Sequence, residues 1–117
     1  MGKLSTHVLD TLHGTPANGV GIQLYAVQGA EKQLLAQVLT NADGRCDAPL
    51  LQGDGLQPGR YELVFQVGKY FAAKGTVLPD PPFLDQVAIN FGVADAQQNY
   101  HVPLVVTPWS YSTYRGS

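Results

Sequence analysis

The chain contains a single cysteine, Cys46, among its 117 residues. One thiol excludes an internal disulfide framework and the usual thiolate-rich zinc sites. Charged residues are also few: seven Lys and Arg against nine Asp and Glu give a formal net charge of −2. This balance excludes a basic surface for nucleic acid and a polybasic patch for a membrane. No apolar run approaches the length of a membrane span.

The familiar signatures of covalent catalysis and of nucleotide binding are missing as well. The sequence has no Gly-x-Ser-x-Gly elbow, no glycine-rich phosphate loop that opens a helix and no dinucleotide-binding fingerprint. Nothing around Cys46 marks its thiol as activated. We therefore expect any enzyme built on this chain to work without a cofactor and without a covalent intermediate.

The start of the chain bears on its location in the cell. Residues 1–4, Met-Gly-Lys-Leu, lack the apolar stretch of a secretory signal. Because there is no signal and the lone cysteine is taken to be reduced, we expect a cytoplasmic protein, or a periplasmic one if a signal has been removed.

Turn residues are abundant, and between them the apolar side chains alternate with period two. The 13 glycines and 8 prolines indicate many short elements. In residues 60–68, Tyr61, Leu63, Phe65 and Val67 share one face, as in a half-buried strand. Strands are expected at 4–9, 20–27, 34–38, 60–68, 83–91, 99–106 and in the tail, with one short helix at 69–74 closed by Gly75. The length and roughly eight strands predict one all-β sandwich domain spanning 1–117.

Two histidines lie within predicted strands. His7 and His101 come together if the strands at 4–9 and 99–106 pair, and they can then act as acid and base or as two metal ligands. No acidic or thiol partner at ligand spacing accompanies them, so the metal site is the less favoured reading. Pro103 lacks a backbone donor, which indicates a bulge or an edge strand. His13 is interpreted as a plain loop residue.

Two arginines and the C-terminal segment complete the candidates. Arg45 directly follows the Asp43-Gly44 turn, and it is either an exposed surface charge or a fork of donors for a carbonyl oxygen or an oxyanion. Arg115 has the same two interpretations. It belongs to segment 111–117, which is either a solvated tail or a strand placed where a ligand binds.

Fragments along the whole chain resemble, in order and spacing, the transthyretin-related proteins, and among them the 5-hydroxyisourate hydrolase family. The fragments are LSTHVLDT at 4–11, Gly14-x-Pro16-Ala17, TNxDGR at 40–45, GxYxLxF at 59–65, YHVPL at 100–104 and YSTYRGS at 111–117. The terminal Tyr-Arg-Gly-Ser separates the hydrolases from the hormone-carrying transthyretins. The departures, at 83–86 and at Trp109, touch none of the candidate residues.

The resemblance implies a transthyretin-like sandwich of two four-stranded sheets, assembled as a homotetramer, a dimer of dimers, with active sites in the channel between the pairs. It implies cofactor-free and metal-free opening of 5-hydroxyisourate to 2-oxo-4-hydroxy-4-carboxy-5-ureidoimidazoline in urate degradation. The residues it assigns to catalysis are His7, Arg45, His101 and Ser117. Those it assigns to substrate binding are His7, Arg45, Tyr114, Arg115 and Gly116.

This chemistry suits the residues themselves. Opening a cyclic amide requires an activated water and stabilisation of a tetrahedral oxyanion. We expect His7 and His101 to polarise the water and relay its proton, Arg45 to stabilise the negative charge, and Ser117 to anchor the water through its hydroxyl or its terminal carboxylate. Which histidine is the base stays open. The alternatives are a transthyretin-like carrier of a small ligand and an accessory sandwich domain that only mediates protein contacts.

Overall fold

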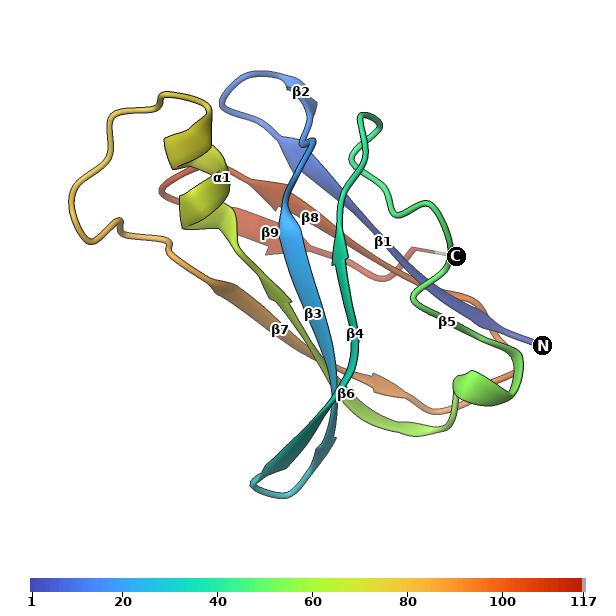
Figure 1. Ribbon diagram of the computed structural model, residues 1–117. Helices are drawn as coiled ribbons and strands as arrows, with labels where there is room; N and C mark the ends of the chain where they lie inside the picture. Colours follow the sequence, from blue (N-terminus) through green and yellow to red (C-terminus); the bar gives the residue numbers. More distant parts are fainter. Residues whose placement is uncertain (117) are drawn as a thin grey trace.

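The computed structural model describes residues 1–116, which form two β-sheets packed face to face with one short helix at one end (Figure 1). The first sheet contains β1 (Lys3–Asp10), β2 (Thr15–Pro16), β5 (Leu51–Gln52), β8 (Tyr100–Val106) and β9 (Tyr111–Thr113). The second contains β3 (Gly21–Gln28), β4 (Glu31–Leu39), β6 (Gly59–Phe65) and β7 (Val87–Val93). A 3₁₀ turn at Gly53–Gly55 precedes β6, and helix α1 (Val67–Ala73) follows it. The predicted two-sheet sandwich with one short helix is confirmed.

Strand order brings the two ends of the chain together in the first sheet. Its order is β2-β1-β8-β9, with β5 paired to the start of β1. Strands β1 and β8 are parallel neighbours, and their register places Ser5 opposite His101 and His7 opposite Pro103. The second sheet, β4-β3-β6-β7, is antiparallel throughout.

Alternation along each strand divides core from surface. In β1, Leu4 and Val8 are fully buried between the sheets, whereas Ser5, His7 and Leu9 are half-buried on the outer face. The second sheet contributes Ile22, Leu24, Leu63 and Phe65 to the same core. Because side chains point to opposite faces with period two, burial of the even positions of β1 places the odd ones, His7 included, on the outer face.

The element boundaries differ from the sequence prediction in three places. Val67, expected in the strand at 60–68, instead begins α1, and the helix ends at Ala73. Gly75 has φ +82° and donates to Ala72, while Thr76 donates to Phe71, so the helix closes with the αL glycine that the sequence predicts. Strand β7 begins at Val87 rather than at residue 83. The first sheet has five strands because β2 and β5 add two-residue pairings to β1.

The expectation that Pro103 marks an edge or a bulge is wrong. Pro103 lies inside β8, between β1 and β9, and the β1–β8 register runs unbroken from Leu4 to Asp10. His101 exchanges backbone hydrogen bonds with Gly116, so the odd positions of β8 direct their backbone groups toward the C-terminal segment. The missing donor of Pro103 faces that segment just beyond Thr113, where β9 ends, and no hydrogen bond to β1 is lost.

Asp10 joins the first turn of the chain to helix α1. Its buried carboxylate accepts hydrogen bonds from the His13 ring at 2.6 Å, the His13 backbone N–H at 3.0 Å and the Tyr70 hydroxyl at 2.7 Å. Burial raises the pKa of this carboxyl, but these hydrogen bonds outweigh burial and hold the pKa below its ordinary value. His13, interpreted from sequence as a plain loop residue, therefore helps to fasten the turn to the core.

Gly44 lets the loop before Arg45 approach β1. It has φ +73°, and a Cβ there would lie 2.5 Å from the Val8 carbonyl oxygen. The Val8 N–H in turn donates to the Gly44 carbonyl at 2.8 Å. Within residues 1–116 the structure contains no helix with the length and hydrophobicity that crossing a membrane requires.

Gly44→Ala is expected to lower the free energy of unfolding by about 2–4 kcal/mol, through backbone strain and the clash with Val8. Gly29→Ala is the matched control because Gly29 also has a positive φ, +59°, but nothing within 4 Å of an added Cβ. That control should cost only about 1–2 kcal/mol. Urea unfolding of both variants at one protein concentration measures the difference, and equal losses would contradict the close approach.

Candidate active site

The two strand histidines meet on the outer face of the first sheet. Parallel pairing of β1 with β8 sets Ser5 opposite His101, and His7 follows two residues later on the same face. The rings of His7 and His101 have centroids 5.7 Å apart and planes inclined by 27°. Strands β1 and β8 do pair, which is the condition under which the sequence predicts that the two histidines meet.

Arg45 lies beside His7. The turn at 41–44 closes through the Gly44 N–H, which donates to the Asn41 carbonyl, while the Asn41 side-chain oxygen accepts from the Asp43 and Arg45 N–H groups. This turn places Arg45 in a single antiparallel bridge with His7. The residue is exposed, so its guanidinium remains open to a ligand on this face.

Ser5 belongs to the same cluster, and the sequence analysis missed it as a functional candidate. Its Oγ lies 2.8 Å from Nδ1 of His101, so the hydroxyl and this ring nitrogen share one proton in a hydrogen bond. That bond orients the ring and leaves Nε2 as the nitrogen available to a ligand. The signal that could have found Ser5 is its position two residues before His7 on the same strand face.

The C-terminal segment pairs with β8, although its side chains at 111–115 are exposed. Gly116 donates to the His101 carbonyl at 2.7 Å and accepts from its N–H at 3.4 Å. A Cβ on Gly116 would lie 3.1 Å from Cβ and Cδ2 of His101, so the absence of a side chain allows this close contact. Ser117, predicted to be catalytic, lies outside the described residues.

Burial and the nearby guanidinium favour the neutral form of both imidazoles. Burial, and then the charge of Arg45, lower the pKa of His7 below its ordinary value. Burial, and then the charges of His7 and Arg45, do the same to the pKa of His101. A neutral imidazole accepts a proton, and the adjacent cation stabilises an anion that forms beside it. The face is thus equipped for base-assisted attack of water on a carbonyl.

Comparisons with known proteins identify the family of the chain. A model described as the HIUase/Transthyretin family matches residues 4–116. The chain belongs to this family. A relative named 5-hydroxyisourate hydrolase from Pseudomonas aeruginosa is 57% identical over 117 residues, which cover 100% of this chain and 93% of the relative. One of the same name from Ralstonia nicotianae is 59% identical over 100% of both chains.

Solved structures of HIUase/Transthyretin family members have the same fold. The structure of Klebsiella pneumoniae 5-hydroxyisourate hydrolase matches with a TM-score of 0.80 and 37% identity over 100% of both chains. An (S)-allantoin synthase matches with a TM-score of 0.94 and 45% identity, and the chain spans 44% of that protein's length. Sea bream transthyretin, at 23% identity and a TM-score of 0.87, is similar in fold alone.

The family resemblance assigns two further residues to substrate binding, Arg115 and Tyr114, and the structure gives each of them other surroundings. The Arg115 guanidinium donates to the Gln98 side chain at 3.1 Å and to the Asn99 carbonyl at 3.0 Å, and lies 4.2 Å from the centre of the Tyr100 ring. Tyr114 is exposed and borders a depression at the edge of the sandwich, between β7 and β8. The structure therefore brings together His7, Arg45, His101 and Gly116, whereas the Arg115 guanidinium is held by Gln98 and Asn99.

A shared metal would need more donors than this cluster offers. Among residues 1–116, no group of three or more His, Cys, Asp or Glu side chains is placed to hold one ion. His7 and His101 would supply two nitrogens, and Arg45 is a cation that repels a metal ion. The chemistry available from these side chains is proton transfer and stabilisation of an anion.

Proposed function

We propose that the protein hydrolyses 5-hydroxyisourate to 2-oxo-4-hydroxy-4-carboxy-5-ureidoimidazoline, a step of urate degradation. The observation that carries this conclusion is the pair of imidazoles, each with a lowered pKa, beside the Arg45 guanidinium, in a chain 57–59% identical over its full length to proteins named as this hydrolase. A carrier of a small aromatic ligand has no use for such a cluster.

In the proposed mechanism, His7 and His101 act on one water. One neutral imidazole accepts a proton as the water oxygen forms a bond to the ring carbonyl carbon of the substrate. Arg45 donates to the oxyanion of the tetrahedral intermediate. That proton is relayed through the second imidazole to the ring nitrogen as the carbon–nitrogen bond breaks, so both imidazoles end neutral. One water is consumed, and the carboxylic acid that forms loses its remaining proton to solvent and becomes a carboxylate. The hydroxyl or terminal carboxylate of Ser117 is proposed to anchor the water.

The test generates the unstable substrate with uricase and follows its ultraviolet decay with and without the protein. Decay many-fold faster than the spontaneous reaction is expected. Circular dichroism of the product adds an independent readout, since spontaneous opening lacks stereocontrol and the enzyme should yield one enantiomer in excess. Unchanged decay would favour the carrier or the accessory domain.

The pH dependence follows from the two lowered histidine pKa values. The base must be neutral, so the rate should fall as the pH drops, with an inflection below the value of about 6.5 typical of free imidazole. Arg45→Gln removes a cation that disfavours the imidazolium, and it should move this inflection to higher pH. Initial rates between pH 5 and 8 (about the range in which imidazoles titrate), corrected for spontaneous decay, measure both. An inflection above that of free imidazole would contradict the assignment.

Ser5 is proposed as a positioning residue for His101. Ser5→Ala should lower kcat about 10-fold, because the ring loses the hydrogen bond that sets its orientation and tautomer. Ser5→Thr keeps the hydroxyl and should restore most of the activity. A purely structural role of Ser5 would lower the yield of active enzyme but leave the pH profile unmoved, so a shift of that profile in Ser5→Ala distinguishes the two.

We also propose a homotetramer, a dimer of dimers, whose paired first sheets enclose the active sites. Three features support it: the histidine pair lies on an outer sheet face, β7 and β9 end their sheets without a further strand, and Phe83 and Trp109 are 68% and 59% exposed. Tyr114 and Arg115 would then approach the active site of a neighbouring protomer. Analytical ultracentrifugation at working concentration tests this, and a monomer that retains full activity would contradict it.

We propose that the protein is located in the cytoplasm. Cys46 is a half-buried free thiol, and burial and then the charge of Asp47 raise its pKa, so it is an unreactive thiol. Fractionation of cells that produce the protein at its natural level tests this, and activity in the periplasmic fraction would contradict it.

A further inference from the structure

We propose that the groove between helix α1 and the outer face of strands β3 and β4 binds a small organic dianion with an apolar middle, of the aromatic dicarboxylate class. The groove encloses about 630 Å³. This lies within the size range of small-molecule sites. It is formed by the second sheet, whereas His7, Arg45 and His101 lie on the first, so it is a separate site.

The groove carries positive charge only. Lys69 of α1 and Lys74, which directly follows the helix, line it, and no Asp or Glu does. Within the described part of the chain, neither ammonium has a carboxylate within ion-pair distance. Lys74 instead lies 5.9 Å from the centre of the Tyr70 ring. In a protein of net charge −2, two such cations in one concavity favour an anion.

A chain of side-chain amides ends in the groove with donors to spare. Gln86 donates to Gln66 at 3.2 Å, and Gln66 donates to Gln23 at 2.9 Å. In this series of hydrogen bonds the side-chain oxygen of Gln23 is the last acceptor. Among residues 1–116, the side-chain N–H groups of Gln23 donate to no other group. They are available to a ligand oxygen, so hydrogen bonding reinforces the preference for a carboxylate.

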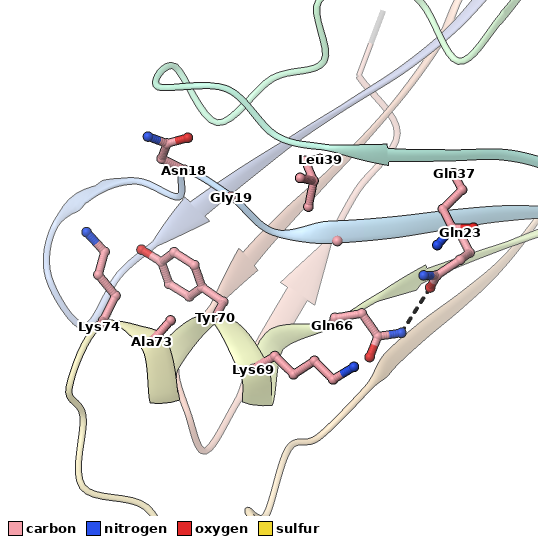
Figure 2. A pocket seen from close by; sticks show the side chains of 11 residues that line it. Asn18, Gly19, Gln23, Gln37, Leu39, Gln66, Lys69, Tyr70, Ala73 and Lys74 are labelled. Atoms are coloured by element: carbon pink, nitrogen blue, oxygen red, sulfur yellow. Dashed lines mark hydrogen bonds between the residues drawn. The ribbon is translucent and has the colours of Figure 1, made fainter.

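The two cationic ends are separated by an apolar stretch. In Figure 2, Lys74 and Asn18 lie toward one end of the groove, Lys69, Gln66 and Gln23 toward the other, and Tyr70 and Leu39 between them. Lys69 lies on the helix and Lys74 directly follows its last residue, so about five residue rises, roughly 7.5 Å, separate their backbones along the axis. A rigid ligand with a carboxylate at each end and an aromatic ring between matches this order of groups.

The floor and one wall of the groove are held by contacts within the protein. Gly21 lies on it, and a Cβ there would come within 3.3 Å of Gln66 Cγ. The hydroxyl of Tyr70 is held by the buried Asp10 carboxylate at 2.7 Å, which fixes the ring that forms the wall. Groups that are held in place before binding lose little freedom when the ligand arrives.

Isothermal titration calorimetry of the full chain with terephthalate tests the proposal. We expect a Kd of about 1 mM or tighter. Binding should weaken at least about 10-fold in the double variant Lys69→Gln/Lys74→Gln, since two charge-assisted contacts are lost. Lys3→Gln/Arg60→Gln removes the same charge from exposed positions elsewhere and should leave Kd unchanged. Circular dichroism confirms that each variant is folded.

Three further measurements distinguish binding in the groove from binding at the active site and from binding through charge alone. Arg45→Gln removes the cation of the first sheet and should leave terephthalate binding unchanged; loss of binding in this variant would place the ligand on the histidine face and overturn the proposal. Terephthalamide, the neutral analogue, should not bind. Inorganic phosphate that binds as tightly as terephthalate would overturn the role of the apolar middle, and absence of any heat with terephthalate would overturn the site itself.

Discussion

His101→Asn is expected to lower kcat for 5-hydroxyisourate hydrolysis by about 100- to 10,000-fold, the usual contribution of a general acid or base. Asparagine is close to histidine in size and can keep the hydrogen bond to Ser5, but it cannot carry a proton between water and the leaving nitrogen. The ring it replaces lies 5.7 Å from that of His7. The effect should therefore appear in the chemical step, with KM little changed.

The third histidine provides the matched control. His13→Asn makes the same substitution in the β1–β2 turn, where the ring bonds Asp10 rather than His7 or His101. It should reduce stability and leave kcat unchanged. His7→Asn and the double variant His7→Asn/His101→Asn add a second test: if the imidazoles relay one proton, the double loss should be close to the larger single loss. Near-normal turnover of freshly made substrate by His101→Asn would rule out the relay.

Arg45→Gln is expected to lower kcat by about 100- to 1000-fold, the typical cost of removing one donor to an oxyanion. Glutamine retains polarity and much of the length but loses the charge and the paired N–H groups. Because Arg45 also lowers the pKa of both histidines, the comparison belongs at a pH above both inflections, where the imidazoles are neutral in either enzyme. The remaining difference then measures anion stabilisation.

Arg45→Lys divides charge from geometry. A lysine ammonium keeps the positive charge but is a single point donor, whereas a guanidinium presents a planar fork. An intermediate rate for this variant is expected if both matter. Arg60→Gln, at an exposed arginine of β6, is the control for surface charge. An Arg45→Gln enzyme with wild-type kcat at the plateau pH would contradict the role in oxyanion stabilisation.

Local patterns account for most of the fold. The alternation of Tyr61, Leu63 and Phe65 predicts β6, the run from Val20 to Ala26 predicts β3, and Gly75 marks the end of α1. These predictions succeed because period-two burial and an αL glycine are properties of neighbouring residues. The prediction for Val67 is wrong. Its position fits the apolar face of the strand, but β6 ends at Phe65 and Val67 is buried as the first residue of the helix.

The candidate active site could be predicted only in part from the sequence. His7, Arg45 and His101 stand out from the sequence as residue types suited to hydrolysis. Ser5 does not, because its role comes from a hydrogen bond to a residue 96 positions away. The prediction that Pro103 marks an edge or a bulge is wrong for the same reason. The effect of a missing backbone N–H depends on which strand faces it, and Pro103 faces the chain just beyond the end of β9.

Alternation and turn chemistry suffice to establish an all-β chain whose odd-numbered β1 residues share a face, since both depend on residues close together in the chain. The meeting of His7 with His101 depends instead on parallel pairing between the first strand and one that begins more than ninety residues later. Strand order is set by how two sheets bury one shared core, a property of the packed chain as a whole. The tertiary structure alone also reveals the groove beside α1, because its cations and amides come from three separate segments of the chain, at 18–23, 37–39 and 66–74.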